Sequence, residues 1–188
     1  MTDQKPEVRR VARRLGVAPE RIAYLEAVSD ADLRALAQAV DNCVVELARQ
    51  GSVGVGRLAK AIPVSAAAKV AERVGSPLMV ARLAYFNDAQ WATKMADKLS
   101  PELIAGAVAE LDAATTVNLV AGMSEKLQFT VLELLVEQQE WVALGDLFGA
   151  LPIDRVQAWA KQVSADQLTE IRVMVPDERR ADVEKALG

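Results

Sequence analysis

Apolar residues recur along this chain at a spacing that predicts short helices. From Pro63 onward, a residue suited to opening a helix recurs every twelve positions, apart from intervals of thirteen after Asn87 and sixteen after Ser124. Serine, aspartate and proline are favoured at helix starts because they satisfy or omit the N–H groups left unpaired there. The expected starts are Pro63, Gly75, Asn87, Ser100, Asp112, Ser124, Glu140, Pro152, Ser164 and Pro176.

Within each unit, the fifth, eighth and twelfth residues are usually apolar and share one face of a helix. Nine units close on an apolar residue: Val74, Phe86, Leu99, Leu111, Met123, Leu151, Val163, Val175 and Leu187. We expect this face to be the core, with Leu111 and Leu168 buried in it. Helices this short are marginal alone and must stack on their neighbours. The period therefore predicts an all-α protein, a right-handed superhelix (solenoid) of short stacked helices with units of about twelve residues.

The first fifty residues follow a less regular pattern. Lys5 to Leu15 reads as a basic helix that Gly16 ends. Pro19 opens a second segment, and Ser29 a third that runs toward residue 50 or breaks near Asp41. We predict a single domain over residues 1–188, with 1–50 as an N-terminal helical cap and 63–187 as the regular repeats.

Units such as LSPELIAGAVAELDAATTVNLVAGMS, in which an apolar residue closes each twelve, carry a family resemblance. Over about residues 63–187, the chain resembles the N-terminal cytosolic domain of the MgtE magnesium transporters. It is also similar to the armadillo-like domains of the flagellar switch protein FliG. The resemblance implies a superhelix and a partner-binding scaffold. The transporter domain senses Mg²⁺, but we expect Glu102, Glu110 and Asp112 to be surface acids, since no ligand motif carries over to them.

The amino-acid composition excludes several kinds of catalytic and metal-binding site. The chain has no histidine and one cysteine, Cys43, which excludes His-based metal sites, Ser-His-Asp catalysis and an intrachain disulfide. The glycine-rich stretch at residues 51–56 lacks the Lys-Ser/Thr ending of a phosphate-binding loop. We therefore expect no enzyme activity and no cofactor. The absence of a long apolar run and of a signal peptide predicts a cytoplasmic protein without membrane insertion.

Charge is distributed in blocks. Residues 51–100 hold seven Lys and Arg against three Asp and Glu, whereas residues 101–150 hold eight acids against one lysine. In a repeat fold these blocks lie at successive places along one axis. If the chain self-associates, a two-fold dimer that sets the positive block of one copy against the negative block of the other is the simplest arrangement.

Two groups of residues are candidates for binding a protein partner. Arg9, Arg10, Arg13 and Arg14 crowd one short helix. Of the three tryptophans, Trp141 lies off the apolar pattern, so it is the one that we expect to be exposed, while Trp91 and Trp159 fall on the core face.

Residues 58–74 support an alternative function. LAKAIPVSAAAKVAERV resembles a DNA-binding helix-turn-helix whose second helix presents Lys69 and Arg73. Pro63 replaces the usual turn glycine and the chain carries a net charge of −4, so nucleic acid is not the partner we expect. We therefore favour a non-catalytic cytoplasmic scaffold that binds a protein partner, with a transcriptional regulator as the alternative.

Overall fold

The computed structural model describes residues 4–43, residue 46 and residues 63–188. Every regular element in these residues is a helix, which confirms the all-α prediction. Residue contacts divide the chain into two compact units, residues 1–51 and 52–188. The prediction that the two form a single domain stays a prediction. The glycine-rich stretch at 51–56 and the first half of the helix-turn-helix candidate lie outside the described residues.

The first unit holds α1 (Pro6–Leu15), the 3₁₀ helix η1 (Pro19–Ala27) and a helix whose described part covers residues 30–43. Gly16 ends α1 with φ of 64°, a left-handed conformation that glycine adopts without strain. The third helix continues through Asp41 without a break. A small apolar core joins the three helices: Val8, Val11, Ala12, Ile22, Leu33 and Ala37.

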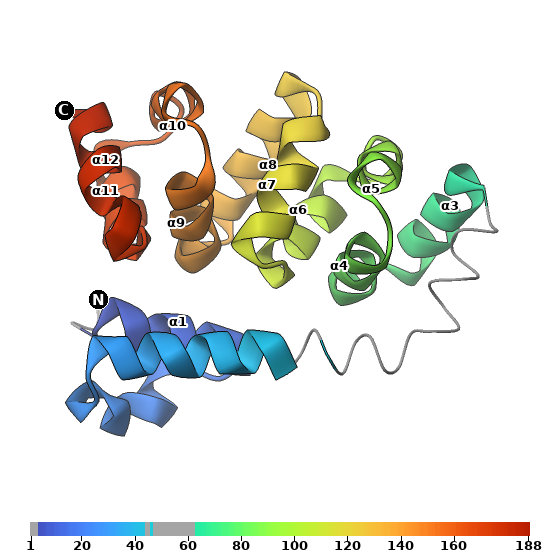
Figure 1. Cartoon of the computed structure of the whole chain (residues 1–188). Helices are drawn as coiled ribbons and strands as arrows, with labels where there is room; N and C mark the ends of the chain where they lie inside the picture. The colour runs from blue at the N-terminus through green and yellow to red at the C-terminus, as the bar shows by residue number, and fades with distance from the viewer. Residues whose placement is uncertain (1–3, 44–45, 47–62) are drawn as a thin grey trace. The chain divides into compact units, whose positions relative to one another are not determined.

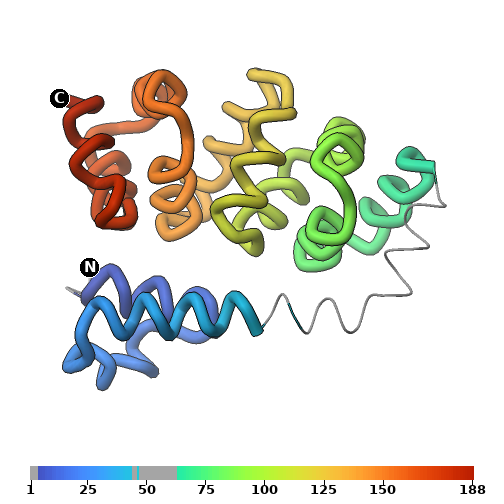
Figure 2. Tube along the Cα trace, in the orientation of Figure 1, coloured from blue at the N-terminus to red at the C-terminus, as the bar shows by residue number. Residues whose placement is uncertain are grey.

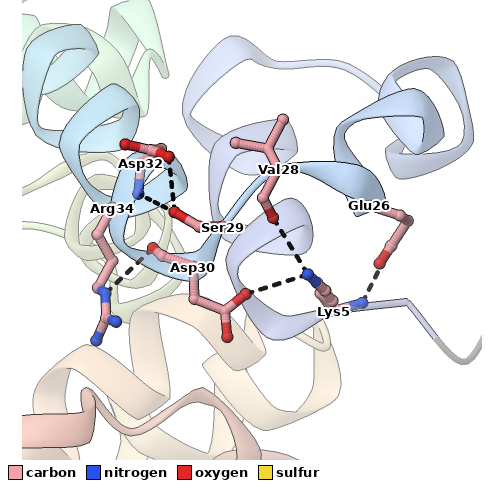
Figure 3. Close-up of polar contacts among 7 residues, drawn as sticks. All are labelled: Lys5, Glu26, Val28, Ser29, Asp30, Asp32 and Arg34. Atoms are coloured by element: carbon pink, nitrogen blue, oxygen red, sulfur yellow. Dashed lines mark hydrogen bonds and ion pairs between the residues drawn. The ribbon is translucent and has the colours of Figure 1, made fainter.

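Polar contacts fix the junction between η1 and the third helix (Figure 3). The Nζ of Lys5 donates to the carbonyl oxygen of Val28 at 3.2 Å and lies 3.5 Å from Oδ1 of Asp30. The hydroxyl of Ser29 accepts from the backbone N–H of Asp32 at 3.2 Å and donates to its carboxylate at 2.7 Å. Ser29 therefore caps the third helix, as its position in the sequence predicts.

The second unit contains ten helices among its described residues, numbered α3 to α12 (Figure 1). Helix α3 and helix α12 lie at opposite ends of the unit (Figure 2). The bounds are α3 (Val64–Val74), α4 (Pro77–Phe86), α5 (Ala89–Ala96), α6 (Pro101–Glu110), α7 (Ala113–Gly122), α8 (Glu125–Glu137), α9 (Trp141–Ala150), α10 (Ile153–Ala160), α11 (Ala165–Met174) and α12 (Asp177–Leu187).

Eight of the ten expected starts coincide with the capping residue of a helix. The other two lie one residue early, because Ser76 and Asp88 cap α4 and α5 rather than Gly75 and Asn87. The reason is chemical. The side-chain oxygens of Ser76 and Asp88 accept hydrogen bonds from backbone N–H groups of the first turn, whereas Gly75 has no side chain and the amide of Asn87 donates to Leu83 at the end of α4.

Helices two places apart in the sequence make the main contacts of this unit. Helix α4 packs on α6, α6 on α8, α3 on α5, α5 on α7, α7 on α9, α9 on α11 and α10 on α12. Several of these contacts are very close because a glycine faces the neighbouring helix. A Cβ placed on Gly145 in α9 would lie 2.4 Å from the backbone carbonyl carbon of Met174 in α11. Glycine therefore sets how closely these helices approach.

The apolar face expected from the sequence forms the core of this unit. Leu111 is 3% exposed, as expected, and Leu168 is half-buried against the same core. The indole of Trp159 is 1% exposed and meets Phe148 edge to face, with ring centroids 6.3 Å apart. Polar side chains join the helices as well, since Gln128 is buried and its amide nitrogen donates to the carbonyl oxygens of Val120 and Met123.

Asp112 provides a test of the caps. Its carboxylate accepts from the backbone N–H of Thr115 at 2.8 Å, and its own N–H donates to the Tyr85 hydroxyl at 2.9 Å. We expect Asp112→Ala to lower the free energy of unfolding by about 0.5–2 kcal/mol, because a helix N–H loses its acceptor. Asp112→Asn, which retains an acceptor, should lose less than half of that. Equal losses in urea unfolding would mean that the carboxylate charge, and not the cap, is what matters.

Candidate interaction surface

Helix α3 presents an open face that combines aliphatic and basic side chains. Val70 is 59% exposed and Val74 is 56% exposed. Lys69 and Arg73 are exposed beside them. Residues four apart form a row along a helix, so Lys69 and Arg73 make a basic row and Val70 with Val74 make an adjacent aliphatic row. We call these four residues the α3 face.

The two valines are exceptions to the pattern of buried apolar positions found along most of the second compact unit. They occupy the eighth and twelfth positions of the twelve-residue segment from Pro63 to Val74. We expected these positions to be buried, and that expectation is wrong for this helix. Helix α3 packs through Ala68 and Ala71 instead, one residue later along the helix. Alanines allow a close approach to α5, and the one-residue shift turns both valines toward solvent.

Of the four large exposed apolar residues in the described part of the second unit, Val70, Val74 and Leu78 lie within nine residues of sequence. Leu78, in the first turn of α4, is 43% exposed. The other large exposed apolar residue there is Val173 in α11, at 40%. Single exposed apolar residues are common, but a cluster over nine residues of sequence is a feature of binding surfaces.

The charges of α3 differ in how they are engaged. Lys69 and Arg73 have no ion-pair partner among the described residues. Glu72, between them in sequence, accepts a hydrogen bond from the backbone N–H of Ser100 at 3.0 Å. Hydrogen bonds from the side chain and backbone of Ser100 hold the pKa of the Glu72 carboxyl below its ordinary value. Glu72 therefore stays ionised and bound to Ser100, and the two cations on α3 still outnumber it.

The arginines of α1 do not form an open basic patch. Arg10 is 9% exposed, and its Nε lies 3.7 Å from Oε2 of Glu7. Arg14 is largely covered, with its Nε 3.2 Å from Oδ1 of Asp41. Arg9 and Arg13 are half-buried. Among the four arginines predicted to bind a partner, Arg10 and Arg14 are thus placed beside acids of the first unit.

Trp141 is also less available than expected. It is the first residue of α9, it is half-buried, and it packs against the core of the second unit. Trp91 is half-buried against the same core, while Trp159 is fully within it. The expectation of an exposed Trp141 is therefore not met, and the exposed apolar groups are aliphatic.

Of the helix-turn-helix candidate at residues 58–74, the structure describes residues 63–74. Lys69 and Arg73 share the exposed side of α3, as a recognition helix requires. The same side carries Val70 and Val74, however, whereas surfaces that bind DNA are polar and positively charged. The basic pair is therefore exposed as DNA binding would require, but the aliphatic row beside it is not a feature expected of a DNA-binding surface.

The described residues show less support for a metal site or a ligand pocket than for the α3 face. Among the described residues, no group of three or more acidic or cysteine side chains is placed to hold a metal ion. Asp112 serves as a helix cap, and Glu102 and Glu110 are exposed. A hollow of about 190 Å³ lies between α4, α5 and α7. Its polar lining includes Tyr85, whose hydroxyl accepts a hydrogen bond from the Asp112 N–H, and Asn87, whose amide donates to the Leu83 carbonyl. No charged side chain lines it.

Comparisons of this chain with protein-family models, with curated proteins and with solved structures gave no match. The resemblance to the MgtE and FliG domains therefore remains an expectation from the sequence pattern. Among the residues that the structure describes, no helix combines the length and apolar character needed to cross a bilayer. Function must consequently be argued from the surface itself.

Proposed function

We propose that this protein is a non-catalytic cytoplasmic scaffold that binds a protein partner through the α3 face of a right-handed superhelix. The contacts between helices two places apart support the superhelix, because such contacts bury each short helix between its neighbours. The helical repeats of the MgtE and FliG domains, which the sequence resembles, are of this kind.

The observation that carries the proposal is the exposure of Val70 and Val74. A terminal helix of a repeat array ordinarily has a polar outer side, because no neighbour covers it. Helix α3 is the first described helix of its array, yet it exposes two valines in the positions where the repeat places core residues. When a partner buries exposed aliphatic side chains such as these, the free energy falls, which favours binding.

The test is affinity capture of the full chain from its native cells with matched variants. We expect Val70→Asp/Val74→Asp to reduce recovery of the specific partner about tenfold or more, since a buried charge in an interface core is costly. Val173→Asp on α11 is the control, because it places one aspartate at another exposed aliphatic position. Far-UV circular dichroism should show both variants folded. Partner recovery that is unchanged by the double variant would overturn the proposal.

The transcriptional regulator remains a second proposal, and Lys69 with Arg73 is the observation in its favour. Binding to duplex DNA should then fall steeply with salt and should be weakened by Lys69→Ala/Arg73→Ala. It should be largely insensitive to Val70→Asp, apart from a uniform electrostatic loss. The two functions are separated by which row of the α3 face the binding depends on.

A further inference from the structure

Two helices of the second unit each carry an exposed pair of like charges without partners. On α3 these are Lys69 and Arg73, and on α8 they are Glu133 and Glu137. None of the four makes an ion pair with a described residue. Like charges four residues apart repel each other and weaken a helix slightly. Each pair is thus locally unfavourable, and a residue that breaks a local rule is a candidate for function.

Two acids of α12 are different, because they already have partners in the same helix. Asp177 lies 2.7 Å from the guanidinium of Arg180, and Asp182 lies 3.3 Å from that of Arg179. Glu125 of α8 pairs with Arg155 at 3.7 Å. Glu133 and Glu137 are therefore the acids of α8 that remain available to an external cation, and their spacing along the helix equals that of Lys69 and Arg73.

The residues next to these charges match in position, and on α8 one of the two, Leu134, is apolar. Val70 and Val74 follow the two cations by one residue, and Leu134 and Gln138 follow the two anions by one residue. On both helices the second row therefore lies on the same side of the charged row. When two such helices face each other, only the antiparallel alignment places the basic row on the acidic row. It also places Val74 opposite Leu134, which is half-buried.

We infer that the partner at the α3 face is a second copy of this chain, whose α8 docks antiparallel on α3. Lys69 then pairs with Glu137 of the second copy and Arg73 with Glu133 of the second copy, while the valines are covered. In a two-fold dimer each contact occurs twice, so four cations meet four anions. This rests on the proposed function and names its partner. In such a dimer between the two charge blocks, the exposed apolar side chains are Val70 and Val74 and not Trp141, which is half-buried.

Charge reversal tests the contact. Sedimentation equilibrium of the full chain should give a dimer that Lys69→Glu/Arg73→Glu weakens about tenfold or more, and Glu133→Lys/Glu137→Lys should do the same. A mixture of the two variants should regain the dimer, because each of its two contacts again joins opposite charges. Lys94→Glu/Lys98→Glu changes the net charge equally at exposed positions on and beside α5, so it should leave the dimer intact.

The outcomes separate this inference from the proposed function. Monomers at every concentration, or a mixture that stays monomeric while each variant is folded, overturn the α3–α8 contact. Capture of another protein that is lost in Val70→Asp/Val74→Asp would still uphold the scaffold. A dimer that survives both reversals shows a different interface and also overturns the inference. Raising the salt concentration should weaken the wild-type dimer, since the four ion pairs are exposed at its edge.

Discussion

Gly145→Ala is expected to lower the free energy of unfolding by about 2–3 kcal/mol, although alanine normally strengthens a helix. The added Cβ would lie 2.4 Å from the carbonyl carbon and 2.4 Å from the Cβ of Met174. Backbone atoms at the end of α11 cannot turn away as a side chain can. Helix α9 and helix α11 must therefore separate, which opens gaps in the buried layer that joins them.

Gly122 provides a matched control for this prediction. A Cβ there would meet Thr93, but only atoms of the threonine side chain, the nearest at 2.2 Å. In a Thr93→Ala background, Gly122→Ala should change stability by less than about 1 kcal/mol, with the helix propensity of alanine acting in its favour. Urea unfolding followed by circular dichroism measures both. If Gly145→Ala proves as mild as the control, the close approach of α9 and α11 is not what fixes their distance.

The sequence predicted most of the helix starts because capping is a local property. Whether Asp112 or Ser124 opens a helix depends on its own side chain and on the next three residues. The two starts that lay one residue early came from extending the twelve-residue period onto Gly75, which has no side chain, and Asn87, whose amide already donates to Leu83 at the end of α4. Local chemistry thus outweighs the average spacing wherever the two disagree.

The candidate surface was predicted only in part. Lys69 and Arg73 were identified from their charge and spacing, but the valines beside them were assigned to the core. Burial depends on which face of α3 meets α5, and this is a tertiary property that the periodicity of a single helix does not determine. The run of alanines at 66–68 with Ala71 was a usable signal, because small residues mark close helix contacts.

The exposure expected of Trp141 and the arginines is not observed, for a related reason. A tryptophan off the periodic pattern can still lie against a neighbouring helix, as Trp141 does at the start of α9. Arginines in a row can still find acids that are distant in sequence, as Arg14 does with Asp41. Exposure of a long side chain depends on all of its neighbours, so it is difficult to predict from the pattern of a single helix.

Trp159→Ala is expected to destabilise the second unit by about 3–5 kcal/mol, the range for removing a large aromatic side chain from a core. The indole is 1% exposed, and its edge-to-face contact with Phe148 is lost together with the buried area. Guanidinium unfolding followed by far-UV circular dichroism is the appropriate measurement, because the substitution also removes a fluorophore. Val173→Ala, at an exposed site, should cost no more than about 0.5 kcal/mol.

Trp159→Phe then distinguishes packing from hydrogen bonding at this position. The indole N–H is buried and finds no acceptor among the described residues, which itself costs about 1–3 kcal/mol in the native protein. Phenylalanine retains most of the apolar area and removes the unsatisfied donor, so we expect its loss to be smaller than that of alanine by about 2 kcal/mol or more. Equal losses in the two variants would mean that the indole nitrogen has an acceptor in solution, such as a buried water molecule, and that this bond stabilises the core.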